Sequence, residues 1–400
     1  MGMLAARMSC VRPSQTKAMT LRAAHLRAEG QSVITLSQGE PDFDTPSKIC
    51  EAGIKAITDG HTRYTPVAGT QALRDAIVKK FKRDNNLTYE RDQVTVGCGA
   101  KQVLFNALLA TLDAGDEVVF PIPCWVSYPD MVQLAGGVPV PVVCGRESGF
   151  KLSASALEAA LTPNTKWLML NSPSNPTGAV YTRKELEDLA GVLRRYSRVM
   201  VLSDDIYEKL VYGDAKFATM AEVSPDLKDR ILTVNGVSKT YAMTGWRVGY
   251  GAGSSELIKA MNTVQGQTTS HTSSISQYAA IIAIEGDQSY LSDFVTTFEE
   301  RRRLVVDMLN TAPGLSCDVP DGAFYVFPSC AGVIGRKTPA GEVIKTDMDF
   351  ALFLLEEFGV AVVPGSGFLA SPFIRISYAT STEQLKTACN NIVLACKSLQ

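Results

Sequence analysis

Short apolar runs alternate with amphipathic stretches over most of this chain, and this alternation restricts its fold more than any other feature. Between about residues 46 and 288, the apolar runs are separated by stretches with helical periodicity, such as 101–112 and 183–196. Strands that alternate with helices favour a mostly parallel sheet with helices on both faces. The runs that we predict to be strands are 94–96, 117–120, 138–143, 167–170, 199–202, 231–234 and 248–250.

The last part of the chain has a different pattern. Residues 290–309 predict one long helix, and shorter strands such as 323–327 follow it. We therefore expect a large α/β domain over residues 46–288 and a smaller α+β domain over residues 289–400. The N-terminal arm, residues 1–45, is expected to join the smaller domain. A chain of 400 residues, 46% of them hydrophobic, has enough apolar material for two cores.

Charge and composition argue against nucleic acid and membranes as partners. The net charge is -2 and the pI is about 6.0, so no global positive field attracts nucleic acid or an anionic membrane. No apolar run reaches the roughly 20 residues that a membrane helix needs. We expect the partners to be small molecules or other copies of this chain.

The cysteines and histidines argue against a metal site. The nine cysteines form no C-x-x-C pair, and His25, His61 and His271 do not stand at ligand spacing. An odd, scattered set of cysteines indicates reduced thiols, so we expect a cytoplasmic protein without a bound metal. The short, mildly basic N-terminus lacks the apolar segment of a secretory signal. It also fits the trimmed end of an organelle precursor, such as a plastid one.

Polar or glycine-rich motifs follow four of the predicted strands directly. In an open α/β sheet, ligands bind outside the carboxyl ends of the strands. We therefore expect these motifs to meet in one crevice. They are 97–101, 171–178, 203–207 and 235–239.

The first of these motifs, Gly97 to Lys101, opens a predicted helix. Small residues before a helix N-terminus let backbone N–H groups approach an anion. An ordinary tight turn explains the motif equally well. It is not a dinucleotide fingerprint, because the third glycine and the matching acidic residue are missing.

The next two motifs carry an amide and a carboxylate. Pro176 holds Asn175 outside the helical region, and a fixed amide can donate to a phenolate-like oxygen. Burial normally raises the pKa of an Asp such as Asp204, but pairing with a protonated ring nitrogen keeps it ionised. A proline-rich connector and a helix N-cap are the ordinary alternatives, and Asp205 competes with Asp204.

Three cationic residues stand in or beside apolar strand runs. Lys239 follows a buried strand, where a lysine is costly unless it is neutral or covalently used. Arg247 can grip a phosphate through two hydrogen bonds. Arg375 lies in the apolar run 373–378 and needs an anionic partner, either a substrate carboxylate or a structural acid. Exposed, solvated side chains are the ordinary alternative for Lys239 and Arg247.

Over nearly its whole length the chain resembles the class I aminotransferases of fold type I, which depend on pyridoxal 5′-phosphate (PLP). That resemblance implies a large, mostly parallel α/β domain and a smaller α+β domain. The motifs that carry it are Ser-Pro-Ser-Asn-Pro-Thr-Gly at 172–178, Ser-Asp-Asp-Ile-Tyr at 203–207, Ser-Lys-Thr-Tyr-Ala-Met-Thr-Gly-Trp-Arg at 238–247 and Ile-Arg-Ile-Ser-Tyr at 374–378. Within the class, residues 38–46, 63–69 and 125–129 resemble the bacterial-type aspartate aminotransferases, which include dual aspartate/prephenate enzymes.

The resemblance implies a role toward PLP for each of several residues. Lys239 binds the cofactor covalently, and Asp204 is favoured over Asp205 as the partner of the pyridine nitrogen, because its spacing to Tyr207 matches the family. The other implied contacts are Asn175 and Tyr207 with the ring oxygen, Trp125 with the ring face, Arg247 and the backbone at Ala100 and Lys101 with the phosphate, and Tyr64 with the phosphate in the other subunit of a homodimer. Many relatives have a phosphate-binding serine three residues before the lysine, where this chain has Gly236, and Ser238 is the candidate replacement.

The resemblance also implies how substrates bind. Arg375 clamps the α-carboxylate beside Gly39, next to Trp125 and Asn175. Thr16 and Lys101 match the residues that bind the distal carboxylate in dual-specificity members. In some members a basic residue at the position of Arg12 accompanies prephenate use. These matches predict amino transfer between aspartate or glutamate and oxo acids, prephenate included, by a ping-pong mechanism.

Three other functions stay open on the sequence alone. The first is another class I activity, such as a kynurenine or alanine aminotransferase or a C–S β-lyase. The second is a non-catalytic protein with the same fold. The third is a nicotinamide dehydrogenase on a doubly wound sheet, against which the missing dinucleotide fingerprint counts.

Overall fold

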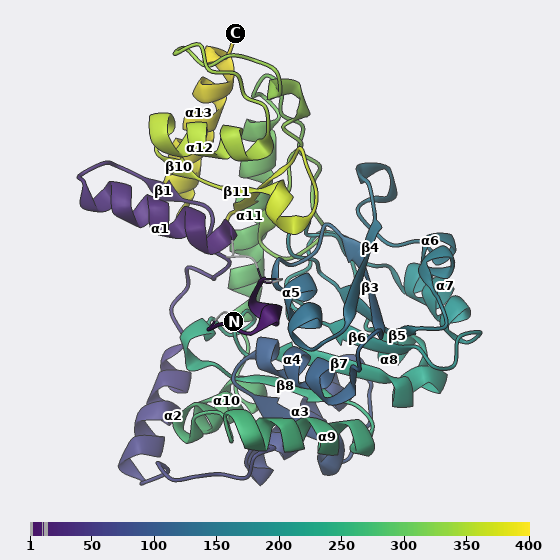
Figure 1. The fold of residues 1–400 in the computed structure, drawn as a ribbon. Coiled ribbons are helices and arrows are strands. Elements are labelled where there is room, and N and C mark those ends of the chain that lie inside the picture. The colour runs from purple at the N-terminus through teal and green to yellow at the C-terminus, as the bar shows by residue number, and fades with distance from the viewer. Residues whose placement is uncertain (1–2, 10, 12–14) are drawn as a thin grey trace.

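The computed structural model describes residues 3–9, 11 and 15–400, and they form two lobes (Figure 1). The larger lobe is built on one seven-stranded sheet in the order β2-β8-β7-β6-β5-β3-β4. Its strands are β2 (Val94–Gly97), β3 (Glu117–Ile122), β4 (Val138–Val143), β5 (Thr165–Asn171), β6 (Met200–Asp204), β7 (Ile231–Gly236) and β8 (Gly249–Ala252). All neighbouring pairs are parallel except those that β8 makes with β2 and β7. Each predicted run overlaps one of these strands, with Val199 and Val248 one residue outside, and the prediction of a mostly parallel sheet is confirmed.

Helices cover both faces of this sheet, because side chains alternate along each strand. On β5, Trp167 and Met169 belong to one buried cluster, whereas Leu168 and Leu170 belong to another. The first cluster includes residues of α4 (Ala100–Thr111), α5 (Ser127–Leu134) and α9 (Ser255–Thr268). The second includes residues of α2 (Ser47–Thr58), α3 (Gln71–Asn85), α6 (Ala154–Ala160), α7 (Arg183–Leu193), α8 (Met220–Val223) and α10 (Ser274–Glu285).

Local capping interactions explain where several helices begin and end. Thr182 and Glu185 form a reciprocal capping box at the start of α7, and Thr70 caps α3 through the N–H of Leu73. Gly359 ends α12 (Asp347–Phe358) in the left-handed conformation at φ 64°. Because α7 ends at Leu193, it is shorter than the predicted stretch 183–196.

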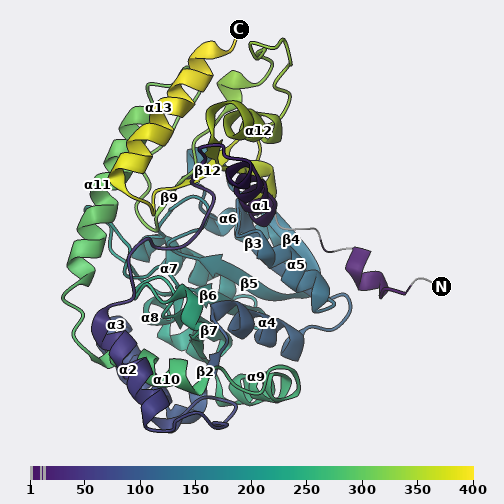
Figure 2. The same ribbon diagram turned by 90° about the vertical axis from the view of Figure 1, so that its left-hand side faces the viewer.

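The smaller lobe combines short strands with long helices. The helices α11 (Leu291–Leu309) and α13 (Thr382–Ser398) lie side by side (Figure 2). A three-stranded antiparallel sheet contains β11 (Val363–Pro364), β12 (Ile374–Ser377) and β9 (Tyr325–Val326). The strand predicted at 323–327 is limited to β9, and Ala323, two residues before it, has a φ of +57°, which a strand does not accommodate.

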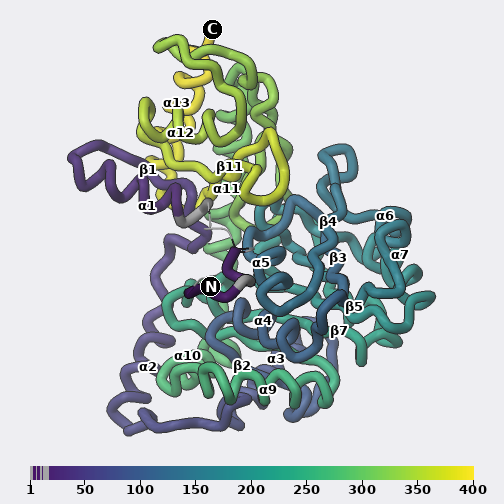
Figure 3. Tube along the Cα trace, in the orientation of Figure 1, coloured from purple at the N-terminus to yellow at the C-terminus, as the bar shows by residue number. Residues whose placement is uncertain are grey.

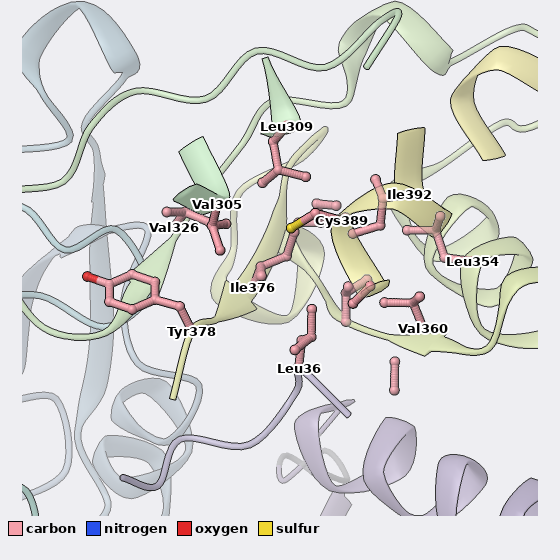
Figure 4. Packing of buried hydrophobic residues seen from close by; sticks show 14 of the residues in the cluster. Leu36, Val305, Leu309, Val326, Leu354, Val360, Ile376, Tyr378, Cys389 and Ile392 are labelled. Carbon is pink, nitrogen blue, oxygen red and sulfur yellow. The ribbon is translucent and has the colours of Figure 1, made fainter. Parts of the chain in front are cut away.

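The helix α1 (Gln15–Ala28) and the segment after it pack onto the smaller lobe before the chain runs on to α2 (Figure 3). Met19, Ala23 and Leu26 of α1 share one buried cluster with residues of α11, α12 and α13. The strand β1 (Ile34–Thr35) pairs in parallel with β10 (Val360–Ala361). Figure 4 shows Leu36 packing among side chains of this cluster, including Ile376 and Val360. The domain limits at residues 45 and 288 stay a prediction.

A buried ion pair joins α3 to the loop after β6. Lys80 and Glu208 are both buried and form a salt bridge. Asn85 closes the group, because it accepts from Lys80 Nζ at 2.8 Å and donates to Glu208 Oε2 at 2.9 Å. Removing one partner of a buried pair leaves the other charge without compensation, which is costly. This group therefore holds the segment that follows β6 against α3.

Lys80→Met is expected to lower the free energy of unfolding by about 3 to 5 kcal/mol, because it leaves Glu208 charged and buried. The matched control is Lys79→Met on the same helix. Lys79 is exposed and pairs with Glu285 at the surface, so its loss is expected to leave the free energy of unfolding nearly unchanged. Urea unfolding monitored by circular dichroism measures both, and equal losses would contradict the assignment.

Candidate active site

A cavity of about 440 Å³ lies at the carboxyl ends of the parallel strands, and both lobes line it. The segments that follow β2, β5, β6 and β7 all contribute to it, so the expected convergence of the four motifs is confirmed. The predicted residues that line it are Gly39, Ala100, Lys101, Trp125, Asn175, Asp204, Tyr207, Lys239, Arg247 and Arg375. A larger cavity, of about 630 Å³, lies in the smaller lobe around residues 338–358 and contains none of them.

Lys239 lies in the loop after β7 and points across the cavity to the N-terminal arm. Its Nζ donates to the carbonyl oxygen of Gly39 at 2.6 Å. Burial lowers the pKa of Lys239 to about 8, although the nearby Glu40 acts in the opposite direction. A substantial part of this amine is therefore neutral at slightly alkaline pH, which is the state a nucleophile needs.

Asp204 is the last residue of β6, and one of its carboxylate oxygens has no partner. Tyr128 donates its hydroxyl to Oδ2 at 2.7 Å, while Oδ1 is buried without a hydrogen bond to any described residue. Burial raises the pKa of Asp204 to about 6. A cationic group in the cavity could donate a hydrogen bond to this unpaired oxygen.

Asp205, the competing candidate, is not among the cavity-lining residues. Side chains alternate along a strand, so the residue after Asp204 faces the other side of the sheet. Asp205 accepts from the hydroxyl of Ser203 at 2.8 Å. The cavity therefore contains Asp204 and not Asp205.

Arg375 is buried and has no acidic partner among the described residues. Its Nη1 donates to Asn175 Oδ1 at 3.0 Å and its Nη2 to the carbonyl oxygen of Ser37 at 2.6 Å, while Nε is unpaired. Burial lowers the pKa of this guanidinium. No structural acid therefore neutralises Arg375 among the described residues. An anion that enters the cavity can pair with its charge.

The other end of the cavity is cationic and has little room for side chains. A Cβ at Gly99 would lie 2.4 Å from Arg247 Nη2, and one at Gly249 would lie 2.0 Å from the backbone N of Ala100. Arg247 has a left-handed φ of 56°, and its Nη1 donates to the carbonyl oxygen of Thr244 at 2.9 Å. With the N-terminus of α4 beside it, this corner is suited to a phosphate.

Lys101 adds a second charge to that corner. Its Nζ lies 4.6 Å from the centre of the Trp125 ring. Burial, followed by repulsion from Arg247, lowers the pKa of Lys101. Neither cation forms an ion pair with another described residue, so both remain available to an anionic ligand.

The backbone at Gly236 has little room for a side chain. A Cβ at Gly236 would lie 3.0 Å from the carbonyl oxygen of Val248 and 3.1 Å from Ile206 Cδ1. A side chain would need its neighbours to move. Ser238 lines the cavity, and its proposed contribution at the phosphate stays a prediction.

Some predicted residues are not brought to the cavity. Tyr64 is 93% exposed and contacts the ring of His271 with centroids 5.7 Å apart. Within one chain it is therefore not a cavity residue. Arg12 lies outside the described residues, and for Thr16 only the backbone, within α1, is described.

No site role was predicted for Asn171, Tyr128 or Tyr325, all of which contact predicted residues. Asn171 ends β5 opposite Asp204; it donates to the backbone oxygen of Asp204 at 2.9 Å and accepts from the N–H of Asn175 at 2.8 Å. Its place at the end of a predicted strand was a usable signal. Tyr128 lies in the motif 125–129, but its hydrogen bond to Asp204 and that between Tyr325 and Tyr207 have no local signal, because these contacts depend on how other elements pack.

Among residues 3–9, 11 and 15–400, no three His, Cys, Asp or Glu side chains are grouped so that they could hold a metal ion. Within the same residues, no helix has the length and apolar character that crossing a membrane requires.

Comparisons with known proteins agree over the whole chain. Residues 31–392 match the family model of aminotransferase class I and II. A probable aspartate/prephenate aminotransferase of Rhizobium leguminosarum bv. phaseoli is 56% identical over 99% of each chain. The aspartate/prephenate aminotransferase of Cereibacter sphaeroides is 55% identical over 100% of each chain.

Solved structures with the same fold carry related names. The aspartate aminotransferase of Rhizobium meliloti superposes with a TM-score of 0.97 at 52% identity and covers 100% of both chains. The aspartate aminotransferase of Thermus thermophilus, solved with maleate, superposes with a TM-score of 0.91 at 40% identity. That match covers 99% of this chain and 100% of the other.

Asp204→Asn is expected to stabilise the ligand-free protein at pH 7.5 by up to about 3 kcal/mol. The pKa of Asp204 rises from 3.8 to about 6 on folding, so the folded state loses stability as the pH rises through this window. At pH 5 the gain is expected to be about half as large. Urea unfolding at the two pH values measures it, with the exposed Asp113→Asn as control. A gain that is equal at both pH values would be inconsistent with a buried ionised carboxylate.

Proposed function

Because the chain belongs to the aminotransferase class I and II family, we propose that it transfers amino groups between aspartate or glutamate and the oxo acids oxaloacetate and 2-oxoglutarate. It also aminates prephenate to arogenate, by the same ping-pong mechanism and with PLP as cofactor. One observation carries this proposal. Three unusual side chains line a single cavity. They are Lys239, whose pKa is lowered, Asp204, which has one buried oxygen without a hydrogen bond, and Arg375, which is buried without an acidic partner among the described residues.

The residues of the cavity fit PLP at both ends. Asp204 Oδ1, buried and unpaired, suits a protonated pyridine nitrogen, and Tyr207 and Asn175 suit the ring oxygen. The corner at Arg247 and the start of α4 suits the phosphate. When bound, PLP supplies an electron sink for negative charge at the substrate Cα.

Lys239 has two tasks in this mechanism. With PLP bound, Lys239 would hold the cofactor covalently in the resting enzyme. Once it is free, its neutral Nζ would act as the general base that takes the proton from the substrate Cα, and its ammonium form would then act as the general acid that delivers this proton to C4′ of the cofactor. Its pKa of about 8 makes the neutral amine accessible near physiological pH. The carbonyl oxygen of Gly39 keeps this Nζ in the cavity when it is free.

Asp204 has an electrostatic task. A cation beside its unpaired oxygen lowers the pKa of the carboxyl, so both groups stay ionised. Tyr128 and Asn171 hold it on two sides, through its Oδ2 and its backbone oxygen. The negative charge is therefore available without rearrangement, which is how preorganised sites stabilise charge.

Substrate recognition uses the cations that have no acidic partner. Arg375 binds the α-carboxylate beside Gly39, Trp125 and Asn175. Lys101, with Thr16, binds the distal carboxylate of a dicarboxylic substrate. Arg12 supports the use of prephenate. The names of the similar proteins from Rhizobium leguminosarum and Cereibacter sphaeroides support this choice of substrates.

The active unit is a homodimer with shared active sites, in which Tyr64 reaches the phosphate of the partner's cofactor. The exposure of Tyr64 supports this, as do the exposed apolar side chains of Ile54 and Ile57 on α2. Contiguous exposed apolar residues often mark a contact with another chain. We propose a cytoplasmic location, which rests on the scattered, unpaired cysteines.

Lys239→Ala is expected to lower the transamination rate by at least about a thousandfold, because the group that moves the Cα proton is lost. The variant is also expected to lack the visible absorbance of a lysine-bound cofactor. Stopped-flow kinetics and an absorbance spectrum measure the two effects. The surface variant Lys216→Ala serves as control, and near-normal turnover of Lys239→Ala would refute the proposed function.

Lys101→Ala is expected to lower kcat/KM for dicarboxylic substrates by about tenfold to a hundredfold, since a charged hydrogen bond is lost. Thr16→Val is expected to act in the same direction, and alanine, which has no distal carboxylate, is the control substrate. The assay compares aspartate with 2-oxoglutarate against glutamate with prephenate. An Arg12→Ala variant is expected to affect only the prephenate pair. If Lys101→Ala and Thr16→Val keep full activity on both pairs, the distal-carboxylate assignment is wrong.

A further inference from the structure

We propose that Tyr325 is a positioning residue of this active site, whose hydroxyl orients Tyr207 and whose ring orients Arg375. The proposal rests on the proposed function above. Tyr325 belongs to β9 of the smaller lobe, is fully buried and lines the cavity. It contacts residues from both lobes, so it is placed to couple the cofactor side of the site to the substrate side.

The hydroxyl of Tyr325 lies 2.8 Å from the hydroxyl of Tyr207, and both groups are buried. Each phenol has one proton, so one of them donates and the other accepts. When Tyr207 donates to the ring oxygen of the cofactor, its own oxygen can only accept, and Tyr325 is the neighbour that donates. A hydrogen bond received by Tyr207 makes it a stronger donor, because linked hydrogen bonds polarise one another.

The ring of Tyr325 supports the guanidinium of Arg375. The Cζ of Arg375 lies 4.6 Å from the ring centre of Tyr325 and 5.0 Å from that of Phe368. Since no acid among the described residues neutralises Arg375, these ring faces and two oxygen acceptors are what stabilise its charge. The ring thus holds the arginine in place while leaving its charge free for a carboxylate.

The hydroxyl of Tyr325 also sets the position of the N-terminal arm. A Cβ at Gly39 would lie 2.6 Å from this hydroxyl oxygen, so only glycine allows the arm to pass so closely. The carbonyl oxygen of the same Gly39 accepts from Lys239. Tyr325 therefore lies next to Gly39, which contacts Lys239. It also lies next to Tyr207, which is proposed to contact the ring oxygen, and next to Arg375, which is proposed to bind the substrate carboxylate.

The two parts of Tyr325 can be separated by substitution. Tyr325→Phe keeps the ring beside Arg375 and removes only the donor to Tyr207. Tyr325→Leu removes the ring as well, so the difference between these variants isolates the ring. Tyr325→Met, a second ring-free variant, guards against a folding defect that is specific to leucine. Tyr378→Phe is the matched control, because Tyr378 is a buried tyrosine of the same lobe whose hydroxyl donates to Ala323 and lies outside the cavity lining.

The hydroxyl is tested by titrating the visible absorbance of the cofactor-loaded enzyme with pH. The ring oxygen carries more uncompensated negative charge once the nitrogen that joins Lys239 to the cofactor has lost its proton. A weaker hydrogen bond from Tyr207 makes that loss harder, so Tyr325→Phe is expected to raise the midpoint by about 0.3 to 1 pH unit. Tyr378→Phe is expected to leave it within 0.1 unit.

The ring is tested by the binding of succinate, an unreactive dicarboxylate, to the loaded enzyme. Tyr325→Phe is expected to keep the Kd within about twofold of the wild type. The ring-free variants are expected to raise it about threefold or more, since the cation–π contact is lost. In the ring-free variants, KM for aspartate and for glutamate is expected to rise together with the Kd for succinate, while kcat falls by a smaller factor.

The outcomes separate this inference from the proposed function. A wild-type protein that shows neither the visible band nor transamination refutes the function. An active wild type overturns the inference if Tyr325→Phe leaves the midpoint unchanged and the ring-free variants bind succinate as tightly as Tyr325→Phe. A shift in Tyr378→Phe equal to that in Tyr325→Phe also overturns it, because the effect would then belong to the packing of the lobe.

Discussion

The parallel pairing of β5, β6 and β7 is the constraint on which the rest of the site depends. Asn171 pairs in register with Asp204, and Asp204 with Val234, so the three strands end at one edge of the sheet. The loops that leave these ends bring Asn175, Tyr207 and Lys239 into one cavity. β8 is antiparallel, and for that reason Arg247, which precedes it, arrives at the same edge. A register shift of one residue on β6 would exchange Asp204 for Asp205 in the cavity, because strand side chains alternate.

Among the described residues, the charged side chains of the site form no ion pairs with one another. Lys239, Asp204 and Arg375 are all held by uncharged groups: a carbonyl oxygen, a phenol, an amide and aromatic rings. Away from the cavity, the buried charges of Lys80 and Glu208 are paired with each other. Unpaired buried charge costs stability, and the two core clusters on the large sheet and the cluster of the smaller lobe offset that cost. Charged side chains without ionic partners in the cavity suit a polar ligand that brings both a cationic ring nitrogen and anionic groups.

Both lobes are needed to complete the cavity. The larger lobe supplies the lysine, the aspartate and the cationic corner, whereas Arg375 and Tyr325 come from the smaller lobe and Gly39 from the arm. The two meet in the hydrogen bond between Tyr207 and Tyr325 and in the one from Arg375 to Asn175. Small changes in how the lobes pack would therefore reach the chemistry directly, through side chains that are buried and already in contact.

The sequence by itself determined the elements of the large sheet, the order of its motifs and the residue types of the site. These follow from local patterns, since apolar runs of strand length, helix caps and polar residues at strand ends depend on neighbours in the chain. The family resemblance favoured Asp204 over Asp205, but only the tertiary structure gave the physical reason, because the two side chains reach different faces of the sheet. It alone revealed Tyr128 and Tyr325, and it left Tyr64 outside the cavity of its own chain. The reason is physical: a phenol beside a carboxylate, or beside another phenol 118 positions away in the chain, is placed by packing between elements, which no local pattern encodes.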